Sequence, residues 1–364
     1  MGRRIILNLA AVLAGIIFSL IFLEVALRLY NPIIQTVKGE RIVLRVNYDE
    51  VRSNTHIPGV APESRIHANS LGFHGADPPA DFADRLTIIT VGGSTTRSVT
   101  QSDDHTWTAL VGDAVAQCFD RTWINNAGFD GHTSFAHIDL VRNYIGKLHP
   151  KVVVMLIGTN ELFVGPNTAK EMRLRHILDE LATRSEIVTL GMTLYRSFHA
   201  WKAGWNWPVL AEGEPMPPDG EARLAMARDL QPEYAERLRL LIRLLRDAHT
   251  VPVLLTQPTL AGIGQDPTTG MDLSRLFNGK FLYEAMTIYN DTMRRVAASE
   301  NVLLIDLGRL MPKDTKYYFD AMHYTDSGAQ KISELTAAGL LPYIEREFPS
   351  YYKGRCQTAP AKPS

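Results

Sequence analysis

The sequence predicts an α/β fold: a parallel β-sheet between layers of helices, preceded by one transmembrane helix. Three observations support this prediction. Short apolar runs alternate with helix-spaced apolar residues from residue 86 onward, glycine-rich polar loops follow the apolar runs, and one long apolar stretch lies near the N-terminus. Strands that alternate with helices are typical of a parallel sheet with helices on both faces.

The apolar stretch Ile5–Leu27 is long enough to span a membrane. It contains 23 residues, and Asn8, Ser19 and Glu24 are its main polar interruptions. A helix rises about 1.5 Å per residue, so roughly 20 residues cross a hydrocarbon core about 30 Å thick. A cleaved signal peptide is the alternative, but its apolar region usually has only about 7–15 residues. We therefore expect an anchor.

Basic residues around this stretch predict its orientation. Arg3 and Arg4 precede it and Arg28 alone follows closely, although three more basic residues occur by position 45. Because basic residues favour the cytoplasmic side, we expect a short cytoplasmic N-terminus. The large domain then lies on the extracytoplasmic side, periplasmic or extracellular.

Five apolar segments are predicted to form the strands of the sheet. One of them, Val152–Ile157, is an unbroken apolar run, as expected for a strand that helices cover on both faces. The full set is Leu86–Val91, Trp123–Asn125, Val152–Ile157, Pro252–Thr256 and Val302–Asp306.

Helices are predicted between and after these strands, where apolar residues recur at spacings of three and four. The third predicted segment is long and charged, and fits either one helix or a pair. The segments are Thr106–Phe119, Phe135–Leu148, Glu221–Ala248 and Ser327–Ile344.

These patterns divide the chain into four parts. We expect an N-terminal transmembrane anchor (1–30), a linker and N-terminal extension (31–85), the α/β domain (86–350) and a C-terminal tail (351–364). An insertion at about 162–220 interrupts the α/β domain and contains Trp201, Trp205 and Trp207. A loop of this length is usually functional or disordered. The tryptophans fit a pocket lid, a contact with the membrane interface or a small satellite core.

Composition excludes several classes of protein. Lys and Arg total 38 against 39 Asp and Glu, so no net positive field is available to bind nucleic acid. The only cysteines, Cys118 and Cys356, allow neither a disulfide framework nor a cysteine-rich zinc site. One bridge between them is possible in an exported domain.

Polar loops come after the predicted strands, at the carboxyl ends where α/β sheets place their chemistry. Ser94, His323 and Asp320 in these loops fit acyl transfer. A serine hydroxyl needs a base to take its proton as it attacks, and a neutral histidine suits that role. A carboxylate on the other ring nitrogen fixes the histidine tautomer. Activity is expected to fall below about pH 6.5, where histidine becomes protonated.

The same loops offer donors for the tetrahedral oxyanion. The backbone N–H groups of Ser94 and Gly128 and the side-chain amide of Asn160 are the candidates. Such donors contribute roughly 2.7–4 kcal/mol each to transition-state binding. His132 and His137 lie near Gly128 but lack partners at zinc spacing, so we interpret them as structural.

The four loops together resemble the motif blocks of the SGNH hydrolases, or GDSL-type esterases. That family has a GDS-like block with the nucleophile, a glycine block, a GxND block and a DxxH block. The matching residues, in order, are Gly93-Ser94, Gly128, Gly158-x-Asn160 and Asp320-x-x-His323, within residues of about 86–345. Two departures are Gly93 before the nucleophile and Glu161 where Asp is usual.

The resemblance implies a flavodoxin-like three-layer α/β/α sandwich. It also implies a membrane-anchored serine esterase with a Ser-His-Asp triad, acting on an acyl ester, taken as O-acetyl, of an envelope polysaccharide, glycan or lipid. No metal or organic cofactor is expected. An O-acyltransferase, a lipase or thioesterase, and a non-catalytic glycan-binding module are the alternatives.

Overall fold

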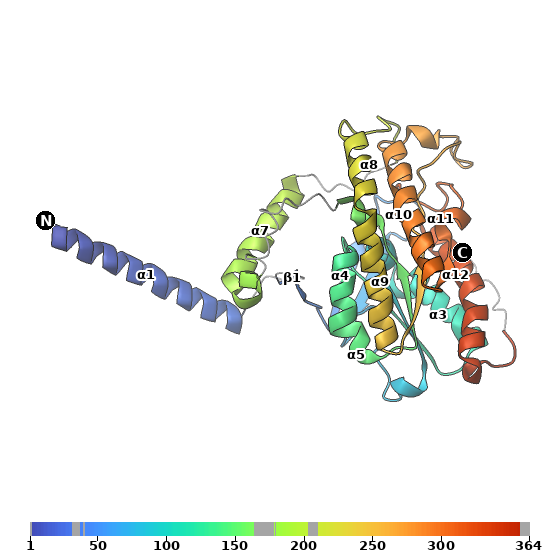
Figure 1. Cartoon of the computed structure of the whole chain (residues 1–364), viewed down its shortest axis with the longest axis horizontal. Coiled ribbons are helices and arrows are strands. Elements are labelled where there is room, and N and C mark those ends of the chain that lie inside the picture. Colours follow the sequence, from blue (N-terminus) through green and yellow to red (C-terminus); the bar gives the residue numbers. More distant parts are fainter. Residues whose placement is uncertain are drawn as a thin grey trace. The chain divides into compact units, whose positions relative to one another are not determined.

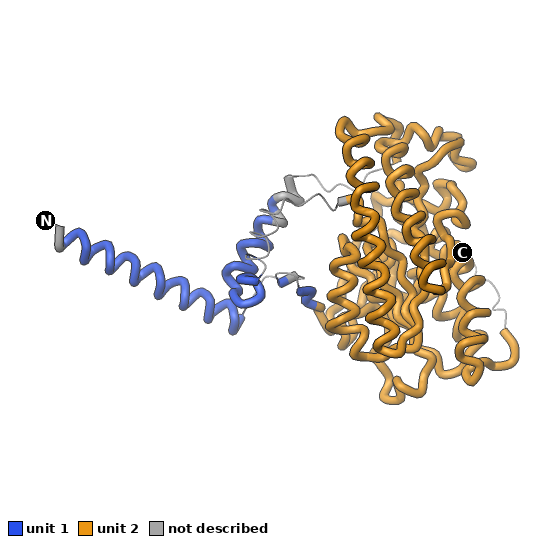
Figure 2. Tube along the Cα trace, in the orientation of Figure 1, with its two compact units in different colours: residues 1–43, 167–206 blue, residues 44–166, 207–364 orange. Residues whose placement is uncertain are grey.

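The computed structural model describes residues 2–30, 37–38, 41–163, 178, 180–202 and 210–356. The chain divides into two units, which Figure 2 shows in different colours. One unit comprises Met1–Val43 and Asn167–Asn206, and the other comprises Leu44–Pro166 and Trp207–Ser364.

Five parallel strands form the central sheet in the described part of the larger unit. Their order across the sheet is β6-β5-β7-β8-β9. In chain order this is second, first, third, fourth, fifth, which is the flavodoxin arrangement. All five predicted strands are confirmed: β5 (Leu86–Gly92), β6 (Thr122–Gly128), β7 (Val152–Leu156), β8 (Val251–Leu255) and β9 (Leu303–Ile305).

Helices cover both faces of this sheet, so the three-layer sandwich is confirmed. In Figure 1, α4 and α9 lie on the face toward the viewer, while α3 packs against α12 on the other face. The helices are α3 (Trp107–Cys118), α4 (Ser134–Leu140), α5 (Gly146–Leu148), α8 (Gly220–Asp229), α9 (Gln231–Asp247), α10 (Gly279–Ser299), α11 (Leu307–Leu310) and α12 (Asp326–Glu347).

Local sequence explains why these helices form where they do. The α9 helix buries Tyr234, Leu238 and Leu245 at helical spacing against the domain. Thr106 caps the N-terminus of α3, and its hydroxyl accepts a hydrogen bond from the N–H of Ala109. The segment predicted as one helix or a pair is a pair, α8 followed by α9. A π-helical turn, Val141–Ile145, joins α4 to α5.

An antiparallel hairpin precedes the sheet and was not predicted. Its strands are β3 (Tyr48–Ser53) and β4 (Glu63–Ala68), and β4 buries every second residue. The loop after β4 reaches the edge of the central sheet. There His74 and Asn126 exchange backbone hydrogen bonds of 2.9 Å in both directions. Residues 31–85, predicted as a linker and N-terminal extension, thus include this hairpin.

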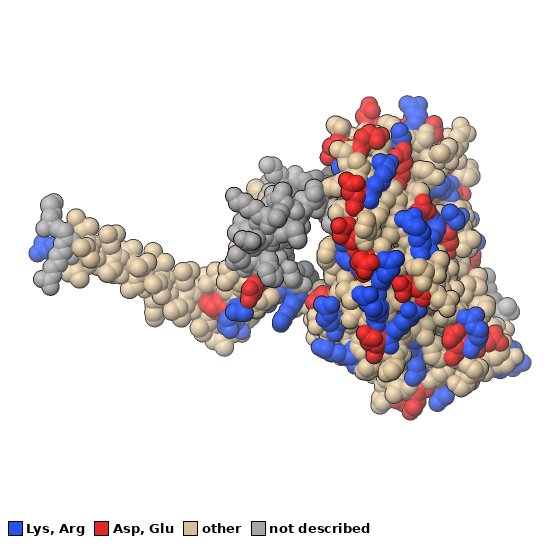
Figure 3. Space-filling model, in the orientation of Figure 1, with Lys and Arg blue, Asp and Glu red and all other residues tan. Residues whose placement is uncertain are grey.

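The smaller unit contains the apolar N-terminal helix α1 (Gly2–Leu29), a short β1–β2 pair (Val37–Lys38 and Arg41–Ile42) and α7 (Glu186–Lys202). Figure 3 shows that the middle of α1 carries no charged side chain. The segment Arg4–Leu29 is long and apolar enough to cross a membrane, which fits an anchor or a signal sequence. Trp205, Trp207 and the side chain of Trp201 lie outside the described residues.

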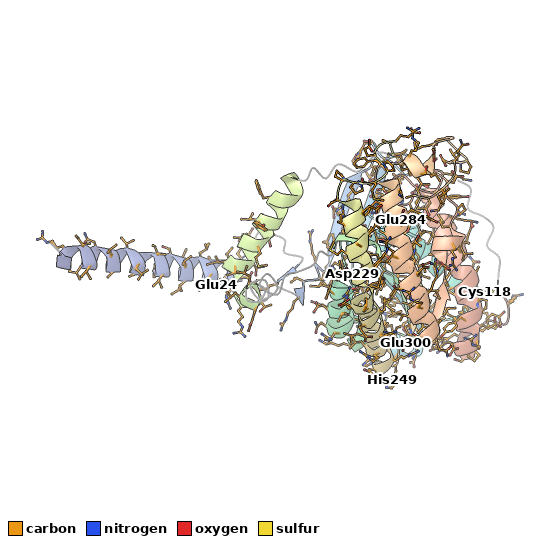
Figure 4. The ribbon with its side chains drawn as sticks, turned by 45° about the horizontal axis from the view of Figure 1, so that its top comes forward. Glu24, Cys118, Asp229, His249, Glu284 and Glu300 are labelled. Atoms are coloured by element: carbon orange, nitrogen blue, oxygen red, sulfur yellow. A yellow bond between two sulfur atoms is a disulfide. The ribbon has the colours of Figure 1, made fainter. Side chains whose placement is uncertain are left out.

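A disulfide bond joins Cys118, labelled in Figure 4, to Cys356. Cys118 is the last residue of α3, and Cys356 follows the closing helix of the domain. The bond, which the sequence left open, attaches the C-terminal segment to the core of the larger unit.

Candidate active site

Ser94 lies at the carboxyl end of β5, where the chain turns sharply into a short helix. Gly93 precedes it, and α2 (Ser94–Arg97) begins at the serine itself. The carbonyl of Gly93 accepts the N–H groups of Thr96 and Arg97, which fixes the turn. The Ser94 side chain remains partly exposed, and its Oγ lies 2.8 Å from Nε2 of His323.

His323 and Asp320 belong to the loop that leads into α12. Nδ1 of His323 lies 2.7 Å from Oδ2 of Asp320. The other carboxylate oxygen, Oδ1, accepts the backbone N–H groups of Met322 and His323, both at 2.7 Å. These bonds hold the buried carboxylate against the imidazole. The structure therefore brings the three predicted residues into one hydrogen-bonded chain, Ser94–His323–Asp320.

Each member of this pair shifts the pKa of the other so that the charged form, carboxylate or imidazolium, is favoured. Burial would raise the pKa of Asp320, but the neighbouring His323 and the hydrogen bonds to the carboxylate hold this pKa below its usual value. Burial would likewise lower the pKa of His323, but the charge and hydrogen bond of Asp320 outweigh it. Asp130 adds a smaller contribution, and the pKa of His323 is raised.

Asn160 follows β7 and lies beside the turn that carries the serine. Its Nδ2 donates a hydrogen bond to the carbonyl of His132 at 2.9 Å. A Cβ atom added at Gly93 would lie only 2.5 Å from that same Nδ2. The first departure from the family motif thus has a physical reason, because glycine at position 93 leaves room for the Asn160 amide.

Gly128 lies at the end of β6, where α2 passes very close. A Cβ atom there would lie 2.4 Å from the backbone nitrogen of Arg97, so only glycine fits. The N–H of Gly128 donates to Oδ1 of Asn126 at 2.8 Å. The structure therefore places Gly128 beside the serine turn, but its N–H already has a partner.

Sequence reasoning missed the role of Asn126, whose side chain links the loop of Gly128 to the turn that carries Ser94. Besides accepting from Gly128, its side chain donates to the carbonyl of Thr96 at 2.7 Å. A signal was present, because an asparagine inside a buried strand must find partners for its amide.

The contacts of Glu161 give a physical reason for the second departure from the motif, Glu in place of Asp. Its side chain is buried and lies 3.0 Å from the guanidinium of Arg237, on α9. It also accepts the N–H of Ser134, the first residue of α4, at 2.5 Å. Negative charge at a helix N-terminus is stabilising. One carboxylate thus joins the loop that carries Asn160 to α4 and α9, and neither Glu161 nor Arg237 was predicted to have this role.

The two nearby histidines are uncharged at neutral pH. Burial lowers the pKa of His132 to about 3, and burial also lowers the pKa of His137 to about 4. His132 contributes to the site through its carbonyl, which accepts the Asn160 amide.

A small pocket opens beside Ser94 and His323. It has room for about one water-sized group. Its wall comes from α2, the segment after it and the loop before α12. The lining residues are Ser94, Thr95, Ser98, Val99, Thr100, Gln101, Phe319, His323 and Tyr324.

Comparison with known families indicates an ester-bond hydrolase. Residues 90–252 match the model of the GDSL-like lipase/acylhydrolase family. The matched segment runs from β5 into β8 and includes Ser94, Gly128 and Asn160. Residues 90–252 are therefore similar to this family, which agrees with the resemblance identified from the four loops.

Two solved structures illustrate distant similarities. One is a GDSL-like lipase from Bacteroides thetaiotaomicron, with 12% identity, coverage of 75% of this chain and 93% of that chain, and a TM-score of 0.39. The other is an acetylxylan esterase from Geobacillus stearothermophilus, with 13% identity, coverage of 70% and 94%, and a TM-score of 0.42. No curated protein matches the sequence.

Proposed function

We propose that the chain is a membrane-anchored serine esterase in which Ser94 is the nucleophile, His323 the base and Asp320 the group that orients it. The observation that carries this proposal is the pair of contacts at the histidine. Nε2 lies 2.8 Å from Ser94 Oγ, and Nδ1 lies 2.7 Å from Asp320. Hydrogen-bond reach between nucleophile, base and orienting carboxylate is the geometry that this chemistry requires.

The reaction proceeds in two acyl transfers. Ser94 Oγ attacks the ester carbonyl carbon as its proton passes to Nε2 of His323. The tetrahedral intermediate then expels the alcohol, which takes that proton as it leaves. Water attacks the resulting acyl-serine as one of its protons passes to Nε2 of His323. The second tetrahedral intermediate then breaks its bond to Ser94 Oγ, which takes that proton back, and the carboxylic acid departs. Asp320 stabilises the imidazolium that forms in each transfer.

The developing oxyanion lies between the serine turn and Asn160. The amide of Asn160 has two hydrogens, and one of them is committed to the His132 carbonyl. We assign the second hydrogen and the N–H of Ser94 to the oxyanion. Gly128 serves as the third donor when its N–H leaves Asn126 Oδ1 for the oxyanion.

The size of the pocket favours a short acyl group. Room for about one water-sized group beside Ser94 fits the methyl of an acetyl ester. We therefore assign an O-acetyl ester of an envelope polysaccharide, glycan or lipid as the substrate.

We further propose that α1 anchors the protein and that the domain lies on the extracytoplasmic side. The disulfide between Cys118 and Cys356 supports this side, because such bonds persist in oxidising compartments. The arginines before the apolar stretch support the same orientation.

Labelling of the full-length protein with a serine-reactive fluorophosphonate tests the nucleophile. We expect labelling of the wild type and none of Ser94→Ala. A panel of p-nitrophenyl esters of increasing chain length then tests the acyl group, and the acetyl ester should react fastest. Retained labelling in Ser94→Ala contradicts the assignment. A preference for long chains supports a lipase or thioesterase, and acylation of an added alcohol supports a transferase.

A further inference from the structure

The N-terminus of α7 is attached to the last turns of α1. The carboxylate of Glu24 accepts hydrogen bonds from the hydroxyl of Ser185 at 2.8 Å and from the N–H groups of Glu186 and Ile187 at 3.0 and 3.2 Å. Figure 4 labels Glu24 on α1 at this junction. A carboxylate at a helix N-terminus also interacts favourably with the helix dipole.

Arg28 reinforces the same junction. Its guanidinium donates to Glu24 at 2.8 Å and to the carbonyl of Arg184, just before α7, at 2.5 Å. An ionised carboxylate inside an apolar helix is costly unless it is paired and hydrogen-bonded. Here the start of α7 and Arg28 together satisfy the carboxylate, so Glu24 sets the level at which α7 leaves α1.

The position of Glu24 along α1, where α7 is attached, coincides with the membrane boundary if α1 spans a bilayer. The 28 residues of α1 extend about 42 Å at about 1.5 Å per residue, whereas the hydrocarbon core is about 30 Å thick. A centred helix therefore projects about 6 Å beyond the core at each end. Glu24 lies about 7 Å from the end at Leu29. The first turn of α7 is thus at the interface between hydrocarbon and headgroups.

Large apolar and aromatic side chains are exposed on α7. Leu194 is 55% exposed, Tyr195 66% and Phe198 57%. Leu194 and Phe198 are one turn apart and share a face. By sequence, Trp201 follows three residues after Phe198 and Lys202 comes next. Aromatic residues with a basic neighbour are the composition that membrane interfaces favour.

We propose that α7 is an interfacial helix that lies on the phospholipid bilayer spanned by α1, with Leu194, Tyr195 and Phe198 directed into the headgroup region. This inference rests on the proposed anchoring by α1. The insertion then provides a second membrane contact, hydrogen-bonded to the anchor through Glu24. Of the three functions that the sequence allows for the insertion, the structure favours the contact with the membrane interface.

Tryptophan fluorescence of the full-length protein in phosphatidylcholine vesicles tests this proposal. The substitutions Trp201→Phe, Trp205→Phe and Trp207→Phe leave Trp107 and Trp123, which are buried in the larger unit, as a constant background. Phe198→Trp then adds a reporter on α7. The matched control is Ile263→Trp in the same background, because Ile263 is an exposed apolar residue of the larger unit, 81% exposed.

We expect the added emission at position 198 to shift to shorter wavelength on reconstitution and to be lost in vesicles whose acyl chains are brominated. The added emission at position 263 should remain at long wavelength and unquenched. Equal esterase activity of both variants and the wild type shows that they fold alike.

Two results overturn the inference. Unquenched emission at long wavelength from position 198 means that the face lies in water, and unquenched emission at short wavelength means that protein covers it, as in a lid or satellite core. Flotation of the same vesicles reports on α1 separately. If the protein floats but position 198 is unquenched, the anchor stands and the inference fails; if it does not float, both fail.

Discussion

Replacement of Asp320 by asparagine isolates the role of the carboxylate, because the side chain keeps its size. Asp320 uses both oxygens as acceptors: Oδ1 takes two backbone N–H groups, and Oδ2 faces Nδ1 of His323. An asparagine has only one acceptor oxygen. If the asparagine oxygen keeps the two backbone hydrogen bonds, the asparagine NH₂ group faces Nδ1 of His323. It then stabilises the His323 tautomer that carries its proton on Nε2. That tautomer cannot accept the proton of Ser94.

The expected loss in kcat is about 10⁴-fold, the size that a wrong histidine tautomer produces in serine hydrolases. This corresponds to about 5.5 kcal/mol of activation free energy. The measurement is kcat and KM for p-nitrophenyl acetate with purified full-length Asp320→Asn. Because Asp320 raises the pKa of His323, the acid limb of any residual activity should also move to lower pH.

Asp314→Asn is a matched control in the same loop region. The Asp314 carboxylate accepts from Thr268 and from the N–H of Lys316 rather than from the histidine. It should retain wild-type kcat and the wild-type pH profile. If Asp320→Asn keeps its fold and more than about a tenth of wild-type kcat, a loss of roughly 1.4 kcal/mol or less, the tautomer argument is wrong.

Three further predictions concern the base, the support of the oxyanion loops and the disulfide. The pKa of His323 is raised above its usual 6.5, and only the neutral ring accepts a proton. Activity should therefore fall as pH falls through a midpoint above 6.5. A kcat/KM profile with its midpoint below that value contradicts this. Glu161→Gln leaves Arg237 without its carboxylate and should lower the unfolding free energy by about 3–5 kcal/mol in urea melts, because the pair is buried; an unchanged midpoint would refute it. Cys118→Ser should cost about 2–5 kcal/mol by the same assay, and the wild type with reductant should reproduce that loss.

The centre of the sheet was predictable because β5, β7 and β8 are buried and consist mainly of apolar residues. The β3–β4 hairpin was not, because strand β4 alternates buried and exposed residues, and its buried set includes Ser64 beside Ile66 and Ala68. Such a strand lacks the continuous apolar signal of β7. Its burial depends on packing against the rest of the larger unit, which local pattern does not encode.

The candidate site likewise contains residues that local sequence identifies and residues that become apparent only from packing. Ser94, Asp320 and His323 were found because each follows a predicted strand, where α/β sheets collect chemistry. Arg237 was missed because it lies on a charged amphipathic helix and resembles a surface residue. Its ion pair with Glu161 exists only once α9 packs beside α4. The disulfide was left open for a similar reason, since its cysteines are 238 residues apart.

The most direct test of the proposed nucleophile is the location of the covalent adduct. Full-length protein treated with a fluorophosphonate is digested, and tandem mass spectrometry identifies the modified residue. We expect one adduct, on Ser94, and a much lower yield in His323→Ala because the base is lost. An adduct on another residue in the wild type, or an undiminished yield on Ser94 without His323, would contradict it.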